Sequence, residues 1–215
     1  MKILIAQPIH EKTVEQLKKE IKENREIDMV LFPEGYLSDE NDLEATCRLA
    51  KEYKVNIATS YRRNNKDRAV IINDIGEKIL ERDKTLPADE VELKGPIIVE
   101  HNGITIGYVL CMEILKAVRD LKRIDEPIDL IVHPIGVGMF SEDQFDLWIN
   151  EAKKVAKTYG TTIVGTSHAD GSYRNCGISI PISYCIDSQG EVIYISKADT
   201  RTRIVDLVSR TVKVN

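Results

Sequence analysis

The stretch MVLFPEG at residues 29–35 predicts a buried strand that ends at a polar turn. Its first four residues are apolar, and the proline, glutamate and glycine that follow break the apolar pattern. Upstream, Val14, Leu17 and Ile21 recur at the spacing of one helix face, and residues 2–6 (KILIA) form another strand-sized apolar run. The quoted stretch is therefore the second strand of a strand–helix–strand unit.

The same alternation continues through the first half of the chain. A helix is predicted to begin after a cap at Ser38 or Asp39, and a strand returns at residues 56–61. Two hairpin signals follow, one at residues 74–76 (DIG) and one at residues 102–103 (NG). This half is thus predicted to alternate strands and helices before it turns to hairpins.

The second half repeats this plan. Helices are predicted at 114–123 and 142–159, strands at 129–133 and 161–166, and a hairpin at 178–196. In the tail at 203–214, apolar and polar residues alternate, but no signal indicates what the segment pairs with. Strand–helix units followed by hairpins predict mixed sheets with helices on an outer face. No linker rich in Pro, Gly or Ser separates the halves, so residues 1–215 are expected to form a single domain.

The composition excludes several classes of protein. Hydrophobic residues make up 42% of the chain and the formal net charge is -5, so neither nucleic acid nor an anionic membrane is expected as a partner. The apolar runs are too short to span a bilayer, and the N-terminus lacks the features of a signal peptide, so a cytoplasmic protein is expected. The four cysteines form no CxxC pair and the four histidines are scattered, so no metal site is expected.

Three residues with useful chemistry, Glu34, Lys84 and Cys111, each follow a predicted strand. Strand ends are where ligand sites commonly open. A thiol with a pKa of about 8.5 is mostly protonated at neutral pH and needs a base or a cation beside it. A glutamate can take the proton, and a lysine can lower the thiol pKa and stabilise an oxyanion. Taken singly, the same residues also suit a core cysteine, a polar strand end and a solvated charged run.

The local contexts of these residues resemble the motifs of the nitrilase, or carbon–nitrogen hydrolase, superfamily. LFPEGYLS at 31–38 is similar to the block that carries the catalytic glutamate. DKTLP at 83–87 resembles the lysine block, and IGYVLCME at 106–113 resembles the block that ends in the nucleophile. The three blocks stand in the family's order, Glu–Lys–Cys. DLIVHP at 129–134 and the hairpin at 177–192 extend the resemblance along nearly the whole chain.

This resemblance implies an αββα sandwich of two mixed sheets with outer helices, paired into a homodimer, and the amphipathic helices at 11–23 and 142–159 are expected to offer an apolar stripe for that pairing. It implies that Cys111 attacks an amide or nitrile carbon and forms a thioester, with Glu34 as general base. Lys84 and the backbone N–H of Met112 are the implied oxyanion donors. The expected substrate is a small linear amide, with no metal or organic cofactor. Nitrile hydrolysis and acyl transfer from the same thioester stay open.

Many relatives carry a second glutamate shortly after the lysine. Glu92 is the candidate here, with Glu90 close behind, and a solvated acidic loop is an equal explanation of both. The chain also departs from the family pattern. It is shorter than most relatives, and MEILK at 112–116 replaces the aromatic residue, aspartate and Arg-Phe-Pro stretch that often follow the cysteine. The family's substrate preferences therefore do not carry over to this chain.

Other functions suit parts of the sequence. A Cys–His hydrolase would use Cys111 and His168 with Asp170 or Asn175, provided that the fold brings these groups together. A binding protein with the same fold but little or no catalysis would account for the shortened loops. Phosphate binding by IGVG at 135–138 is excluded, because the segment lacks the third glycine of a dinucleotide motif and the lysine of a P-loop.

Overall fold

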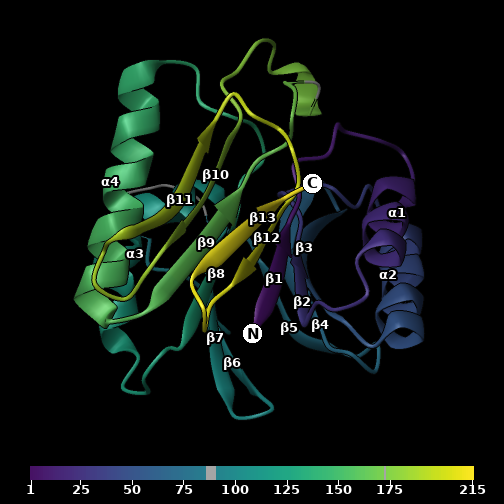
Figure 1. Ribbon diagram of the computed structural model, residues 1–215, viewed down its shortest axis with the longest axis horizontal. Coiled ribbons are helices and arrows are strands. Elements are labelled where there is room, and N and C mark those ends of the chain that lie inside the picture. Colours follow the sequence, from purple (N-terminus) through teal and green to yellow (C-terminus); the bar gives the residue numbers. More distant parts are fainter. Residues whose placement is uncertain (86–90, 172) are drawn as a thin grey trace.

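Two β-sheets lie face to face between two pairs of helices in the computed structural model, which describes residues 1–85, 91–171 and 173–215. Helices α1 and α2 cover one side of the pair of sheets, and α3 and α4 cover the other (Figure 1). The layers therefore follow the order helix, sheet, sheet, helix. The predicted αββα sandwich is confirmed.

The first sheet has seven strands among the described residues, in the order β13-β12-β1-β2-β3-β4-β5. β1, β2 and β3 are parallel to one another, whereas β4 and β5 on one side and β12 and β13 on the other are added antiparallel. The strand bounds are Lys2–Ile5 (β1), Met29–Leu31 (β2), Asn56–Arg63 (β3), Lys66–Ile72 (β4), Lys78–Asp83 (β5), Arg203–Asp206 (β12) and Thr211–Val214 (β13).

The second sheet has six strands in the described part of the chain, in the order β11-β10-β9-β8-β7-β6. Its parallel strands are β7, β8 and β9, and antiparallel strands extend them on both sides, as in the first sheet. The strand bounds are Ile98–His101 (β6), Ile104–Tyr108 (β7), Leu130–Pro134 (β8), Thr162–Thr166 (β9), Ile182–Ile186 (β10) and Val192–Lys197 (β11). The repetition noticed in the sequence is thus a repetition of strand order.

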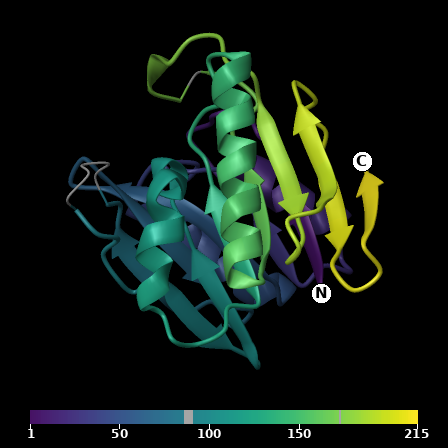
Figure 2. The same cartoon turned by 90° about the vertical axis from the view of Figure 1, so that its left-hand side faces the viewer.

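Each parallel strand is connected to the next through a helix. The helices are Glu15–Glu23 (α1), Glu40–Tyr53 (α2), Ile114–Asp120 (α3) and Glu142–Tyr159 (α4), with short 3-10 turns at Cys111–Glu113 (η1), Leu121–Arg123 (η2) and Tyr173–Asn175 (η3). Of the two predicted caps, Ser38 and Asp39, it is Asp39 that caps α2, because its carboxylate accepts the N–H groups of Asn41 and Asp42. Figure 2 shows α3 and α4 side by side on the outer face of the second sheet. None of the described helices combines the length and apolar character that a bilayer crossing requires.

Apolar side chains fill three layers, one under each helix pair and one between the sheets. Alternation along β2 illustrates the division, because Val30 faces α1 and α2 whereas Met29 and Leu31 face the opposite sheet. Both faces of each sheet are therefore covered, which explains why the parallel strands are apolar at nearly every position. The catalytic candidates lie where these buried strands end.

The tail forms a hairpin that the sequence did not predict. β12 pairs antiparallel with β1, so that Asp206 lies opposite Lys2, and β13 completes the sheet edge. The alternation at 203–214 was visible in the sequence, but its partner strand lies at the other end of the chain. A local pattern contains no information about such a distant pairing.

Candidate active site

Glu34 lies in the turn that follows β2, and only 2% of its surface is exposed. Its backbone N–H donates to the carbonyl oxygen of Ile135, which follows strand β8 of the second sheet, at 3.2 Å. The next residue, Gly35, has a positive φ of 70° and donates its N–H to Ser60 Oγ at 2.6 Å. Glycine adopts this backbone conformation at little cost. The turn is therefore fixed from both halves of the chain, and it holds the carboxylate in the interior.

Lys84 follows β5 directly. Its backbone N–H donates to the carbonyl oxygen of Asp67 on β4, at 2.8 Å, which continues the pairing of the two strands by one residue. At the other end of the side chain, Nζ donates to Glu34 Oε1 at 2.6 Å. The structure therefore brings together two of the predicted residues, which are 50 positions apart in the chain.

Cys111 begins the turn η1 between β7 and α3. Its φ of +52° lies in the left-handed region, which costs a residue with a Cβ about 1–2 kcal/mol. Strain of this kind is typical of residues whose exact orientation matters to a site. The thiol lies within hydrogen-bonding reach of the Glu34 carboxylate and of the backbone N–H of Gly136. Thiol, carboxylate and ammonium thus form one cluster.

A buried ion pair ties the cysteine turn to the lysine strand. Both guanidinium NH2 groups of Arg82 donate to the Glu113 carboxylate, at 2.9 and 2.6 Å. The same carboxylate accepts the backbone N–H of Leu110 and of Thr85, each at 2.7 Å. The residue before Cys111 and the residue after Lys84 are therefore bound to one side chain. The sequence had placed Glu113 at the end of the block that resembles the nucleophile motif, and Arg82 in the charged run before Lys84, without pairing the two.

Burial sets the ionisation state of the thiol. It raises the pKa of Cys111 to about 12, and the charge of Glu34 raises it as well. The Lys84 ammonium and the Gly136 N–H act in the opposite direction, but they do not outweigh burial. Lys84 therefore does not by itself produce a thiolate in the resting site. A base beside the thiol would be needed to ionise it.

Glu34 is the carboxylate within reach of that thiol. Burial raises the pKa of its carboxyl group, although the Lys84 ammonium pulls that pKa down. For Lys84, burial lowers the pKa, but the charges of Cys111 and Glu34 more than compensate, so its pKa is raised and the ammonium persists. A carboxylate with a raised pKa accepts protons more readily near neutral pH than an exposed glutamate does.

Asp67 is a further carboxylate near this cluster, and sequence reasoning missed it. Its side chain is buried on β4 and pairs with Arg62, at 3.5 Å, and with Arg174. Its charge raises the pKa of both Glu34 and Lys84. The segment around Asp67 is rich in charged residues, so the sequence gave no sign that this carboxylate is buried.

The remaining predicted site residues have different fates. Met112 follows Cys111 in η1, so its backbone N–H belongs to the peptide unit next to the thiol. Glu92 is not brought to the thiol, because its side chain is 63% exposed and pairs with Arg123. Glu90 lies outside the described residues. Glu92 is therefore close to Lys84 in the sequence, but its side chain points to the surface and not to the thiol.

His168, the partner in the alternative Cys–His arrangement, is buried next to the backbone of Glu34. Its Nε2 lies 3.1 Å from the carbonyl oxygen of Glu34, and its ring lies near those of His10 and Tyr36. Burial lowers the pKa of His168 to about 4, so the ring is neutral at physiological pH. Since a carbonyl oxygen can only accept, Nε2 carries the proton. This nitrogen is therefore engaged by the backbone of Glu34.

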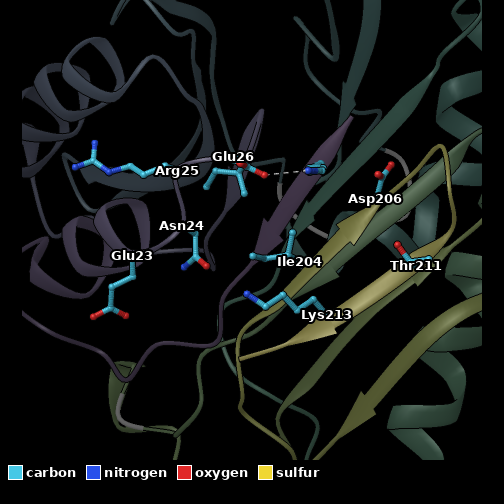
Figure 3. Close-up of a pocket in the computed structure, with 10 residues that line it drawn as sticks. Glu23, Asn24, Arg25, Glu26, Ile204, Asp206, Thr211 and Lys213 are labelled. Carbon is cyan, nitrogen blue, oxygen red and sulfur yellow. Dashed lines mark ion pairs between the residues drawn. The ribbon is translucent and has the colours of Figure 1, made fainter.

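A surface hollow of about 330 Å³ lies elsewhere, between the end of α1 and the strands β1, β12 and β13. Charged side chains of both signs surround it, and Lys2 forms an ion pair with Glu26 there at 3.6 Å (Figure 3). It contains neither a thiol nor a buried base, so the strand-end cluster is the better candidate. Across residues 1–85, 91–171 and 173–215, no three His, Cys, Asp or Glu side chains are grouped to hold a metal ion.

Several solved structures share this architecture. A CN-hydrolase superfamily protein from Xanthomonas campestris, with an arsenic adduct in its active site, has a TM-score of 0.78 and 13% identity over 98% of this chain and 92% of its own. A cysteine-to-serine mutant of the Nesterenkonia AN1 amidase, from the nitrilase superfamily, has a TM-score of 0.77 and 14% identity. The match covers 98% of this chain and 92% of the amidase. A carbon–nitrogen hydrolase from Helicobacter pylori G27 has a TM-score of 0.72 and 13% identity. The match covers 98% of this chain and 90% of that hydrolase.

No family model matches the sequence, and no curated protein matches it either. The likeness to the solved structures is therefore one of fold, carried by an arrangement of elements that spans both halves of the chain. The superposition covers 98% of this chain in both cases. This chain has the fold of the carbon–nitrogen hydrolase superfamily.

Proposed function

We propose that the chain hydrolyses the C–N bond of a small linear amide through a thioester on Cys111. One observation carries the proposal: Glu34 Oε1 lies 2.6 Å from Lys84 Nζ, and the Cys111 thiol is within hydrogen-bonding reach of the same carboxylate. A buried base that contacts both a thiol and a cation suits attack on a neutral carbonyl group. The solved amidases of the same fold add support, because one of them carries acrylamide on its active-site cysteine.

In the first half of the reaction, Glu34 takes the proton of the Cys111 thiol as sulfur attacks the carbonyl carbon. The C=O electron pair moves to oxygen, and the Lys84 ammonium and the Met112 N–H stabilise the resulting oxyanion. When the oxyanion collapses, the C–N bond breaks and Glu34 returns its proton to the leaving nitrogen. The products of this half are ammonia or an amine and a thioester on Cys111.

In the second half, water replaces the amine. Glu34 accepts a proton from water while the water oxygen attacks the thioester carbon, and the same donors stabilise the second oxyanion. Collapse breaks the C–S bond, and sulfur recovers the proton held by Glu34. A carboxylic acid leaves, and the thiol and the carboxylate return to their starting states. Glu34 and Cys111 account for every proton transfer, and Lys84 remains an ammonium throughout.

An activity screen tests this proposal. The protein is incubated with a panel of small amides and nitriles, and release of ammonia is followed. Turnover of at least one amide is expected, with Cys111→Ala inactive and Cys176→Ala unchanged, because Cys176 is exposed and far along the chain from the site. Equal turnover by wild type and Cys111→Ala would contradict the mechanism. Turnover of nitriles alone would keep the nucleophile but replace the substrate class.

A covalent probe tests the nucleophile without a known substrate. Fluoroacetamide adds its acetamide moiety to the active-site cysteine of a mutant Nesterenkonia amidase. The same reagent is expected to modify Cys111 first among the four thiols, because Glu34 can remove its proton. Peptide mass mapping identifies the modified residue. First labelling of Cys176, which is exposed, or of Cys47 would show that no base activates Cys111.

We also propose that two copies of the chain pair through the outer faces of α3 and α4. Leu115 on α3 and Leu147 on α4 are 41% and 48% exposed, although these helices pack against each other and against the sheet. Pairing would cover these apolar side chains. Light scattering is expected to give twice the chain mass of 24.3 kDa, and Leu147→Glu is expected to lower it. A monomer mass at all concentrations would contradict the dimer.

A further inference from the structure

A fully buried histidine, His133, lies next to the nucleophile without contacting the thiol in the described hydrogen bonds. It stands near the end of β8, the strand beside β7, and its Nε2 is 2.8 Å from the carbonyl oxygen of Cys111. A carbonyl oxygen can only accept a hydrogen bond, so Nε2 carries the proton. Burial lowers the pKa of His133 to about 4, so the ring is neutral and its other nitrogen has a free lone pair.

Tyr184 supplies the donor for that lone pair. Its hydroxyl oxygen lies 2.5 Å from His133 Nδ1, and both groups are buried. Because neutral Nδ1 accepts, the tyrosine O–H donates. The hydrogen bonds therefore run in one direction, from Tyr184 through His133 to the Cys111 carbonyl, and the hydroxyl fixes which ring nitrogen holds the proton.

The sheet is built to allow this chain of contacts. Tyr184 on β10, Gly165 on β9 and His133 on β8 are opposite one another in the strand register. A Cβ at Gly165 would lie 2.5 Å from Tyr184 Cζ and 2.8 Å from its hydroxyl oxygen, so only glycine leaves room for the ring. On the other side, the Trp148 ring of α4 stacks on His133 with centroids 5.7 Å apart and planes 17° apart. The imidazole is thus held in one orientation.

The carbonyl that His133 binds belongs to the peptide between Cys111 and Met112. That peptide is trans, so its C=O and N–H point in opposite directions. A carbonyl drawn toward His133 therefore directs the Met112 N–H away from β8. The hydrogen bond from His133 also stabilises the left-handed conformation of Cys111. Rotating φ of Cys111 would move its carbonyl, together with its thiol, away from the His133 N–H.

We infer that His133 and Tyr184 are positioning residues, which orient the Cys111–Met112 peptide so that its N–H stabilises the oxyanion. The inference rests on the proposed function, since it assigns a task within that reaction. Neither residue exchanges a proton with substrate. His133 is thereby distinguished from the histidine of a Cys–His hydrolase, which would contact the thiol itself.

Two rates measured on the same variants test the inference. The first is kcat for an amide substrate, and the second is the rate at which iodoacetamide alkylates Cys111. Alkylation displaces iodide from a tetrahedral carbon and develops no oxyanion, so it depends on the thiol and Glu34 but not on the Met112 N–H. A defect in the oxyanion donor therefore lowers kcat alone, whereas general damage to the site lowers both rates.

His133→Leu removes the donor and keeps a similar volume. It is expected to lower kcat by about 10²-fold, the loss typical of an oxyanion donor. KM and the alkylation rate are expected to stay within about twofold of wild type. His133→Gln retains an N–H that can reach the carbonyl, and it is expected to recover at least about tenfold of the lost kcat. Unchanged kcat in His133→Leu, or equal losses in kcat and alkylation, would overturn the inference.

Tyr184→Phe keeps the ring and serves even if His133→Leu fails to fold. Without the hydroxyl, the imidazole proton can move to Nδ1, so kcat is expected to fall by about 2- to 10-fold, the worth of one hydrogen bond. Alkylation is again expected to be unchanged, and a Tyr184→Phe enzyme with wild-type kcat would overturn the inference. Normal alkylation of Cys111 in a wild-type protein that turns over no amide would instead overturn the proposed function, and the inference with it.

Discussion

The ends of β2 and β8 share one backbone plan but carry different chemistry. β2 is the middle strand of the parallel trio in the first sheet, and β8 is its counterpart in the second. The sequences are VLFPEG at 30–35 and IVHPIG at 131–136, so each strand meets a proline two residues before a glycine. After the proline, one strand has Glu34 and the other has Ile135. The two turns are joined directly, because the Glu34 N–H donates to the Ile135 carbonyl.

The residues before the two prolines, Phe32 and His133, also differ, since one is apolar and the other polar. Phe32 packs into the apolar layer under α1 and α2, where its ring lies 4.5 Å from that of Tyr36. His133, at the equivalent position, binds the Cys111 carbonyl. The first turn thus holds the proposed base. The second turn binds that base's backbone N–H through the Ile135 carbonyl, and it binds the backbone of the proposed nucleophile through the His133 imidazole. Repetition of the backbone provides two rigid platforms, and single side chains decide what each one does.

The largest effect is expected from removing the base on the β2 side. Glu34→Gln keeps the shape of the side chain but cannot accept the thiol proton, so kcat is expected to fall by about 10²–10⁴-fold. Amide turnover measures the loss, and circular dichroism checks that the fold persists. Glu52→Gln, an exposed change on α2, is the control. Activity above one tenth of wild type in Glu34→Gln would remove Glu34 from the mechanism.

Lys84→Ala removes the cation that contacts the β2 turn. Loss of this oxyanion donor is expected to lower kcat by about 10²–10³-fold. Lys66→Ala is the matched control, because Lys66 is on the same hairpin and its side chain forms a surface ion pair with Asp83, at 3.3 Å. Comparable losses in both variants would mean that damage to the hairpin, and not the missing ammonium, explains the result.

His168→Leu separates the two catalytic hypotheses. His168 binds the Glu34 carbonyl, so its loss is expected to cost only about 2- to 10-fold in kcat, the worth of one hydrogen bond. That is less than the effect expected for His133→Leu, which disturbs the oxyanion donor. If a Cys–His pair did the chemistry instead, His168→Leu would be about as damaging as loss of the nucleophile. Measured kcat values for the two leucine variants decide between these outcomes.

The pH dependence tests the electrostatics of the β2 turn. Glu34 must be ionised to accept a proton, and its pKa is raised, so kcat/KM is expected to fall on the acid side at a higher pH than an ordinary glutamate would give. The charge of Asp67 contributes to that raised pKa. Asp67→Asn is therefore expected to move the acid limb to lower pH. An acid limb that moves upward, or not at all, would contradict this electrostatic account.

The smallest effect is expected on the β8 side. Ile135→Val removes one buried methylene and leaves the backbone carbonyl in place. The free energy of unfolding is expected to fall by about 0.5–1.5 kcal/mol, measured by denaturant unfolding, with kcat unchanged. A large loss of kcat would show that the Ile135 side chain, and not only its backbone, contributes to the site.

Much of the architecture was predictable, because patterns within short stretches of the sequence indicate it. Apolar runs, helix periodicity and turn residues predicted strand–helix units, hairpins and mixed sheets with outer helices, and they narrowed the cap of α2 to Ser38 or Asp39. The αββα order itself was implied by the resemblance to the carbon–nitrogen hydrolase superfamily. The motifs around Glu34, Lys84 and Cys111 were also visible, since each lies within a few residues of a strand end. The structure brings these three together, and their proposed roles await the experiments above.

What the sequence did not reveal depends on pairs that are remote in the chain. Arg82 and Glu113 are 31 positions apart, and His133 and Tyr184 are 51 apart. Each residue alone suits an ordinary strand or turn, and only the fold shows that its partner is buried beside it. Glu92 illustrates the opposite error, because it is near Lys84 in sequence yet pairs with Arg123 at the surface.

The most direct test of the central claim is the mass of the Cys111 peptide during turnover of an amide. A reaction quenched with acid in the steady state, and then digested, is expected to yield this peptide with the added mass of the acyl group. Cys111→Ala is expected to yield no acylated peptide and no ammonia. Steady turnover in which the acyl group appears on another residue, or persists in Cys111→Ala, would contradict a thioester mechanism at Cys111.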